Sequence, residues 1–156
     1  MRKAVALDAN LLVLLVIGLA DRRYIAVHKR SKGFSDTDFD LLTTLISESA
    51  EVLVTPNALS EASNLLRQIG EPAKSEIGQA FLRLIRNTRE IYVRSLDASS
   101  RTEFLRLGLS DNVLLEVSKN DIVILSTDLD LYLAATAAGY TALNFNHERD
   151  RRYDYE

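Results

Sequence analysis

The stretch Val-Ala-Leu-Asp-Ala-Asn-Leu-Leu-Val, residues 5–13, is the most informative part of this chain. Its first three residues form an apolar run of the length of a buried strand, and a second apolar run over residues 11–20 suits a packed helix. Asp8 lies between the two runs, where the strand would pass into the helix. Ligands bind at the carboxyl edge of the strands in open parallel α/β sheets. Asp8 is therefore the first residue for which we expect a function.

Short apolar runs continue to alternate with helical patterns along the rest of the chain. We expect strands over residues 3–7, 51–54, 91–96, 121–125 and 140–145. We expect helices over residues 10–19, 36–46, 55–70, 72–85, 99–108, 110–117 and 129–138, with Ser110 capping the sixth. This order predicts an α/β fold in which a mainly parallel central sheet has helices on both faces. The expected domain covers residues 1–145, and the polar tail 146–156 is expected to be partly loose.

The composition narrows the possible functions. The 156 residues, 47% hydrophobic and 26% charged, suit an ordinary globular domain. The absence of cysteine excludes disulfides, thiolate metal sites and cysteine nucleophiles, and it agrees with a reducing compartment such as the cytoplasm. With only His28 and His147, the chain is poorly supplied for a histidine zinc site or a serine–histidine–aspartate triad. The net charge of −3 argues against a protein that simply coats nucleic acid, but it allows a nuclease whose metal ions carry positive charge.

The N-terminus loosely resembles a signal peptide, because two basic residues precede an apolar run that ends at Ala20. Asp8 and Asn10 interrupt the apolar character, and the run is too short to span a membrane. We therefore expect a cytoplasmic protein without a membrane segment.

Five acidic residues fall where a strand is expected to pass into a helix or within the first turns of an expected helix. They are Asp8, Glu61, Asp111, Asp128 and Asp130. A parallel sheet brings such junctions to one edge, so we expect these carboxylates to lie near one another. Taken alone, Asp111 and Asp128 are explained as well by favourable charge at a helix N-terminus, worth about 0.3–1 kcal/mol each.

Glu61 is harder to explain as an ordinary structural residue. Its neighbours on the helix, Ala58, Ala62, Leu65 and Leu66, form an apolar stripe, so we expect its carboxylate to be partly desolvated unless it is paired or bound to a cation. A structural ion pair would also explain it, but the sequence specifies no obvious partner. Several carboxylates at one edge also repel one another unless a cation lies between them. Mg²⁺ and Mn²⁺ prefer oxygen ligands, and a metal-bound water can attack a phosphodiester. The acids therefore favour metal-assisted phosphodiester hydrolysis.

At these acidic motifs the chain resembles the PIN-domain ribonucleases. Residues 7–10 (Leu-Asp-Ala-Asn) are similar to the Asp-x-Asn opening of that family, and residues 55–61 are similar to its second acidic motif. Residues 109–111 (Leu-Ser-Asp) resemble the third motif, and residues 124–128 resemble the fourth. The motifs follow in the family's order over residues 3–144, and Ser126 stands where the family more often has threonine.

The resemblance implies a PIN-like three-layer fold, a Mg²⁺ or Mn²⁺ cofactor and a metal-dependent endoribonuclease that cleaves single-stranded RNA. It implies that the catalytic, metal-binding acids are Asp8, Glu61, Asp111 and Asp128, with Asp130 as an alternative to Asp128 and with Asn10 and Ser126 orienting the acids or the bound water. Many small single-domain members are dimeric toxins of toxin–antitoxin pairs. The resemblance therefore also implies a homodimer and an antitoxin protein as partner.

Two other functions compete with this interpretation. One is a non-catalytic PIN-like module that binds RNA or a protein, against which the complete acidic set argues. The other is a phosphatase of the haloacid-dehalogenase type, which needs a second aspartate two residues after the first to act as an acid; Asn10 occupies that position.

A basic segment over residues 21–33 is a further candidate for RNA binding. It contains Arg22, Arg23, Lys29, Arg30 and Lys32, which would contact RNA phosphates. A solvated helix end and loop explains these charges equally well.

Overall fold

The structure, a computed structural model, describes residues 2–153. Its strands are β1 (Val5–Leu7), β2 (Val52–Val54), β3 (Arg89–Glu90), β4 (Val123–Ser126) and β5 (Ala142–Asn144). Its helices are α1 (Ala9–Ala20), α2 (Asp36–Ser47), α3 (Pro56–Leu66), α4 (Ala73–Asn87), α5 (Ser95–Ser99), α6 (Phe104–Leu107), α7 (Leu109–Ser118), α8 (Leu129–Ala137) and α9 (Phe145–Tyr153), with a short 3₁₀ turn, η1 (Arg22–Tyr24), after α1. Within this part of the chain no helix is both long and apolar enough to cross a membrane.

The predicted α/β fold with a parallel sheet is confirmed. The strands form one sheet in the order β3-β2-β1-β4-β5, and every neighbouring pair is parallel. β1 lies at the centre, with Val5 opposite Val52 of β2 on one side and Val123 of β4 on the other. The strand order reverses between β1 and β4, so the carboxyl ends of these two strands flank the crevice where such sheets bind ligands.

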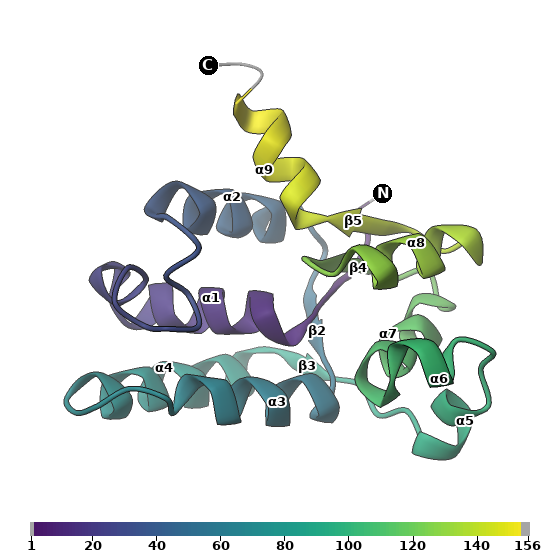
Figure 1. The fold of residues 1–156 in the computed structure, drawn as a ribbon, viewed down its shortest axis with the longest axis horizontal. Coiled ribbons are helices and arrows are strands. Elements are labelled where there is room, and N and C mark those ends of the chain that lie inside the picture. The colour runs from purple at the N-terminus through teal and green to yellow at the C-terminus, as the bar shows by residue number, and fades with distance from the viewer. Residues whose placement is uncertain (1, 154–156) are drawn as a thin grey trace.

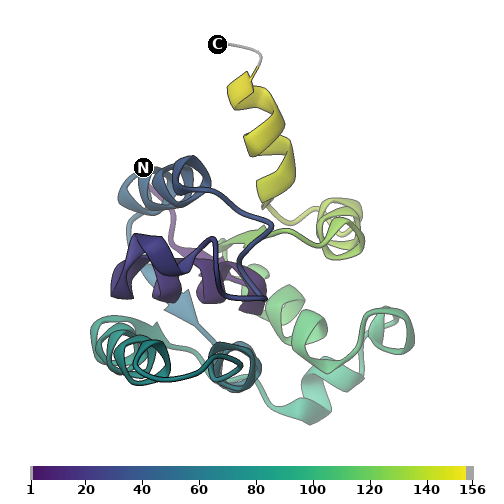
Figure 2. The same ribbon diagram turned by 60° about the vertical axis from the view of Figure 1, so that its left-hand side comes forward.

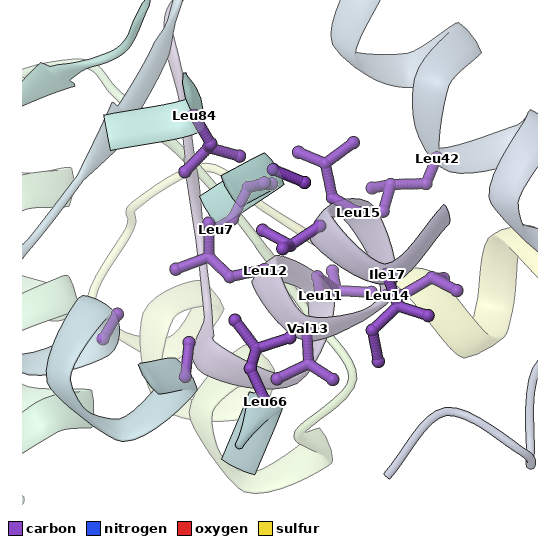
Figure 3. Packing of buried hydrophobic residues seen from close by; sticks show 14 of the residues in the cluster. Leu7, Leu11, Leu12, Val13, Leu14, Leu15, Ile17, Leu42, Leu66 and Leu84 are labelled. Atoms are coloured by element: carbon purple, nitrogen blue, oxygen red, sulfur yellow. The ribbon is translucent and has the colours of Figure 1, made fainter. Parts of the chain in front are cut away.

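Two helical layers cover the sheet, with α1–α4 on one side and α5–α8 on the other (Figure 1). α1 is the centre of the larger layer, because α2, α3 and α4 all pack against it. Its buried side chains, among them Leu11, Leu12 and Ile17, leave almost no polar face (Figure 3). A helix that is apolar all round is stable only when it is enclosed. Each fully buried leucine or isoleucine contributes about 1.5–3 kcal/mol to that enclosure.

Gly18 allows α2 to approach α1 closely. A Cβ atom at this position would lie 2.2 Å from ring carbons of Phe39, a separation that real Cβ atoms do not adopt. The glycine in this apolar helix is therefore required by packing against α2.

Several expected element boundaries are wrong. The third strand is Arg89–Glu90 instead of residues 91–96, because the chain leaves the sheet after Ile91 N–H bonds to the Val54 carbonyl. Helix α3 ends at Leu66, four residues before the expected Gly70. Helix α7 begins at Leu109 behind Gly108, whose φ of 84° favours glycine, so Ser110 lies inside the helix and does not cap it.

The expected loose tail is instead largely a helix, since α9 extends from Phe145 to Tyr153. The Asn144 side-chain oxygen accepts hydrogen bonds from the backbone N–H groups of Asn146 and His147, at 2.9 and 3.3 Å, so this end of the helix is capped. Residues 154–156 of the expected tail lie outside the described residues.

Buried Asp38 attaches α9 to α2. Its side chain is 1% exposed, and Arg149 and Arg152 of α9 both donate to Asp38 Oδ1, at 3.0 and 2.9 Å. Burial by itself would raise the pKa of Asp38, but hydrogen bonds from the Ser35 N–H and the two arginines hold it below its ordinary value. The tail therefore becomes ordered because its arginines neutralise a buried carboxylate about 110 residues earlier in the chain.

The substitution Asp38→Asn tests this attachment. We expect it to lower the free energy of unfolding by about 3 kcal/mol, because it removes the charge that two partly buried arginines share. Urea unfolding at pH 7 measures the change. The control is Asp36→Asn, an exposed acid in the same helical turn, for which we expect a loss of at most about 1 kcal/mol. Equal losses in the two variants would contradict the structural role of Asp38.

Candidate active site

Asp8 occupies the junction between β1 and α1 and is 6% exposed. One carboxylate oxygen, Oδ1, caps α1 by accepting the Leu11 N–H at 2.9 Å. The other, Oδ2, accepts the Ser126 hydroxyl at 2.5 Å and the Thr127 N–H at 3.0 Å. Asp8 therefore connects the two strands on either side of the switch point and holds the start of the most buried helix.

Burial raises the pKa of Asp8, while hydrogen bonds from Ser126, Leu11 and Thr127 act in the opposite direction. The negative charge of Asp128 raises the pKa further. Asp8 is thus an acid whose ionised form is costly in this surrounding unless a positive charge approaches it.

Ser126 lies between Asp8 and the next acid. Its hydroxyl donates to Asp8 and accepts the Asp128 N–H at 2.9 Å, so one hydroxyl fixes both the first carboxylate and the loop that carries the fourth. Asn10, at the exposed start of α1, donates to the Thr127 hydroxyl at 3.5 Å. Both residues thus contact the site where the sequence predicts them.

Asp128 and Asp130 have different positions. Asp128 lines the pocket and caps α8, because its Oδ1 accepts the N–H groups of Asp130 and Leu131 at 2.9 and 3.1 Å. Asp130 is exposed in the first turn of α8 and does not line the pocket. The geometry therefore favours Asp128 over Asp130 as the fourth acid.

Glu61 reaches the site from α3, whose start is fixed by the Thr55 hydroxyl accepting the Ala58 N–H. The expected desolvation of Glu61 is wrong, because its side chain is exposed while Ala58 and Ala62 are buried. Glu61 lies on the flank of the apolar stripe and projects toward the pocket instead of the core. Asn64, one turn further along α3, also lines the pocket. Sequence reasoning missed it, although its spacing of three residues from Glu61 places it on the same helical face.

Asp111 comes from the first turn of α7 and is partly buried. Burial raises the pKa of Asp111 to about 7, and the negative charges of Asp128, Asp8, Glu61 and Asp130 add to the effect. The other three acids predicted at this sheet edge are therefore close enough to Asp111 to raise its pKa.

The pocket at this edge has a volume of about 620 Å³. Among the described residues its lining is Asp8, Ala9, Asn10, Glu61, Asn64, Leu107, Leu109, Ser110, Asp111 and Asp128. This lining includes four carboxylates and not one lysine, arginine or histidine. The side chains offer oxygen atoms of carboxylate, amide and hydroxyl groups, which suit a hard divalent cation.

The acids surround the pocket without converging on one point. Across residues 2–153, no three histidine, cysteine, aspartate or glutamate side chains are grouped so that they could hold a metal ion together. Mg²⁺ commonly uses only one or two carboxylates and retains several waters. The Mg²⁺ or Mn²⁺ cofactor therefore stays a prediction.

The basic segment does not line this pocket. Arg22 pairs with Asp40, and Arg23 pairs with Asp21 at 2.7 Å, so both neutralise nearby acids beyond the far end of α1. Asp21 follows Asp8 by thirteen residues, which in a helix is about 20 Å. Two of the five predicted RNA contacts therefore lie well away from the acids.

The raised pKa of Asp111 gives a testable effect of pH on stability without metal. The folded protein holds this proton up to about pH 7, whereas the unfolded chain releases it near 3.8, so the contribution of this group is full at low pH and is lost as the pH rises to 7. Asp111→Asn cannot lose a proton. We expect the variant to match wild type near pH 4 and to exceed it by about 1–2 kcal/mol at pH 8, a value reduced for solvent screening.

Urea unfolding in EDTA at pH 4, 6 and 8 measures this difference. The control is Asp130→Asn, which removes one charge from an exposed position and should leave a nearly constant difference from wild type. If the stability difference between Asp111→Asn and wild type did not change with pH, the raised pKa of Asp111 would be wrong.

No model of a known protein family matches the chain, and a search of curated proteins finds no match either.

Proposed function

We propose that this protein is a metal-dependent endoribonuclease that cleaves single-stranded RNA. The observation that carries the proposal is the pocket at the β1–β4 switch point, which is lined by four carboxylates and, among the described residues, by no basic side chain. The order of the four acidic motifs along the chain, which resembles the PIN-domain ribonucleases, adds support. The absence of cysteine is in keeping with action on RNA in the cytoplasm.

The donor set is chemically suited to Mg²⁺ or Mn²⁺, since it consists of oxygen atoms. One or two of the carboxylates of Asp8, Glu61, Asp111 and Asp128 would hold the cation, with water molecules as its other ligands. When bound, it would supply positive charge that activates a water molecule and stabilises the negative charge that develops on a phosphodiester.

The remaining tasks belong to the side chains themselves. Ser126 and the Thr127 N–H keep Asp8 Oδ2 at a fixed position, so this carboxylate does not need to reorganise during the reaction. One oxygen of Asp128 caps α8, which fixes the orientation of the side chain. The Asn10 and Asn64 side chains at the exposed rim have N–H groups with which to position phosphate oxygens. Glu61, Asn64 and Asp128 are exposed, so a single strand can reach the acids without any part of the protein unfolding.

The toxin role, the antitoxin partner and the homodimer stay predictions of the family resemblance. A binding module without catalysis is the alternative that the following experiment separates from an enzyme.

Cleavage of a labelled, mixed-sequence single-stranded RNA in Mn²⁺ tests the function. We expect wild type to cleave, EDTA to abolish cleavage, and Asp128→Asn to lower the rate about 100-fold, the scale of losing one group that stabilises charge in a transition state. Asparagine keeps the helix cap, so the fold should persist. The matched control is Asp130→Asn, two residues away and outside the pocket, which should retain activity within a few-fold. A well-folded wild type that binds but never cleaves RNA would overturn the enzymatic proposal.

Metal binding has a readout that does not depend on activity. At a hundredfold excess of Mn²⁺ over its Kd we expect the free energy of unfolding of wild type to rise by about 2.7 kcal/mol. Asp111→Asn should lose most of this increase, because it removes a ligand and a charge from the pocket, whereas Asp130→Asn should keep it. Urea unfolding with and without Mn²⁺ measures all three proteins. An equal increase in all three would show that Mn²⁺ binds elsewhere.

A further inference from the structure

The segment between α1 and α2 carries a concentration of positive charge. Residues 22–33 contain five lysines and arginines and no acidic residue, in a chain whose net charge is −3. Arg22 and Arg23 are paired with Asp40 and Asp21. The other three cations, Lys29, Arg30 and Lys32, are exposed. The structure therefore separates this segment into a neutralised part and a cationic part.

The cationic part is held in a defined conformation by buried polar residues between its charges. His28 is fully buried, its Nδ1 accepts the Arg30 N–H at 3.0 Å, and its Nε2 therefore donates to the Leu66 carbonyl at 3.1 Å. Ser31 is also buried and donates to the Ile25 carbonyl at 2.9 Å. Exposed cations thus alternate with buried anchors, which hold the backbone that carries them in one conformation.

These anchors place the cations beside the C-terminal end of α3, the helix whose Glu61 and Asn64 line the acidic pocket. Arg30 donates to the Gln68 side chain at 2.7 Å, just after the end of α3. Gln68 lies two residues beyond the last residue of α3 and four residues after Asn64 in the chain. Asn64 lines the pocket together with Glu61. Figure 2 shows the segment between α1 and α2 crossing in front of α1 above the end of α3.

We propose that Lys29, Arg30 and Lys32 form a phosphate-contacting track for the part of a single-stranded RNA that extends beyond the acidic pocket along α3. This inference rests on the proposed nuclease function. The pocket is lined by carboxylates and the track carries exposed cations, so an RNA strand whose scissile phosphate lies in the pocket would find fixed protein cations for phosphates further along α3. Arg22 and Arg23 lie outside the track because their charges are already neutralised.

The test variant is Lys29→Gln/Arg30→Gln/Lys32→Gln, and the control is Arg2→Gln/Arg83→Gln/Arg86→Gln. The control removes the same amount of charge from three exposed arginines. Arg2 precedes β1, and Arg83 and Arg86 lie in the last half of α4. α4 leads into the start of β3, at the sheet edge opposite the acidic pocket. The probe is a fluorescein-labelled 20-nucleotide mixed-sequence RNA. Anisotropy in EDTA gives its Kd at several salt concentrations, and cleavage in Mn²⁺ is measured separately.

We expect the test variant to bind about tenfold more weakly than wild type at 100 mM salt. Its log Kd should also depend less steeply on log salt by about 2, because each phosphate that a protein cation neutralises on a single strand adds about 0.7 to this slope. The control should stay within about twofold of wild type in affinity.

Equal weakening in both variants, or a test variant unchanged in affinity and salt dependence, would overturn the track. If wild type cleaves in either of those cases, the nuclease proposal stands without the track. If RNA binding depends on the track but nothing is cleaved, only the nuclease proposal fails. Retention of wild type on acidic lipid vesicles but not on RNA would also overturn the track.

Discussion

The hydrogen bonds that converge on Asp8 are the interaction on which the rest of the structure depends. One oxygen starts α1, the helix around which α2, α3 and α4 are packed. The other oxygen accepts hydrogen bonds from Ser126 and Thr127. Ser126 is the last residue of β4, the strand on the far side of the switch point, and Thr127 follows it. The same carboxylate therefore holds together the central strand, the central helix and the loop that carries Asp128.

The buried acids that the proposed chemistry needs lower the stability of the metal-free fold. Burial raises the pKa of Asp8 and of Asp111, so in the absence of a cation the ionised acids destabilise the fold near neutral pH. The enclosure of the apolar α1 supplies the stability that offsets this cost. A divalent cation in the pocket would remove the repulsion, which makes cation binding and folding linked equilibria.

Charges elsewhere are distributed according to what surrounds them. Asp38 is as buried as Asp8 but receives two arginines from α9, and its pKa falls. The acids of the pocket receive no such partner among the residues that line it. Buried His28 uses both ring nitrogens to fix the cationic part of the segment between α1 and α2, which contains Lys29, Arg30 and Lys32. The fold thus neutralises Asp38 within the protein and leaves positive charge exposed beside the C-terminal end of α3.

The sequence by itself determined the parallel α/β fold and the candidate acids, because both follow from local patterns. An apolar run that ends in Asp8 and is followed by a second apolar run specifies a strand, a junction and a helix whatever lies around them, and parallel strands bring such junctions to one edge. Helix starts with a local cap, as at Ser35 and Thr55, are predictable for the same reason.

Tertiary contacts decided what local patterns do not contain. The choice of Asp128 over Asp130 depends on which side of α8 faces the pocket, and the exposure of Glu61 depends on how α3 is rotated against α1. The helix at residues 145–153 exists where a loose tail was expected, because its arginines meet Asp38 from a distant part of the chain. Ion pairs neutralise Arg22 and Arg23, whereas Arg30 in the cationic part of the same segment donates a hydrogen bond to Gln68, just after the end of α3. Each of these outcomes depends on an interaction between groups that are far apart in sequence. The free energy of that interaction is gained only after the chain has folded and brought the groups together.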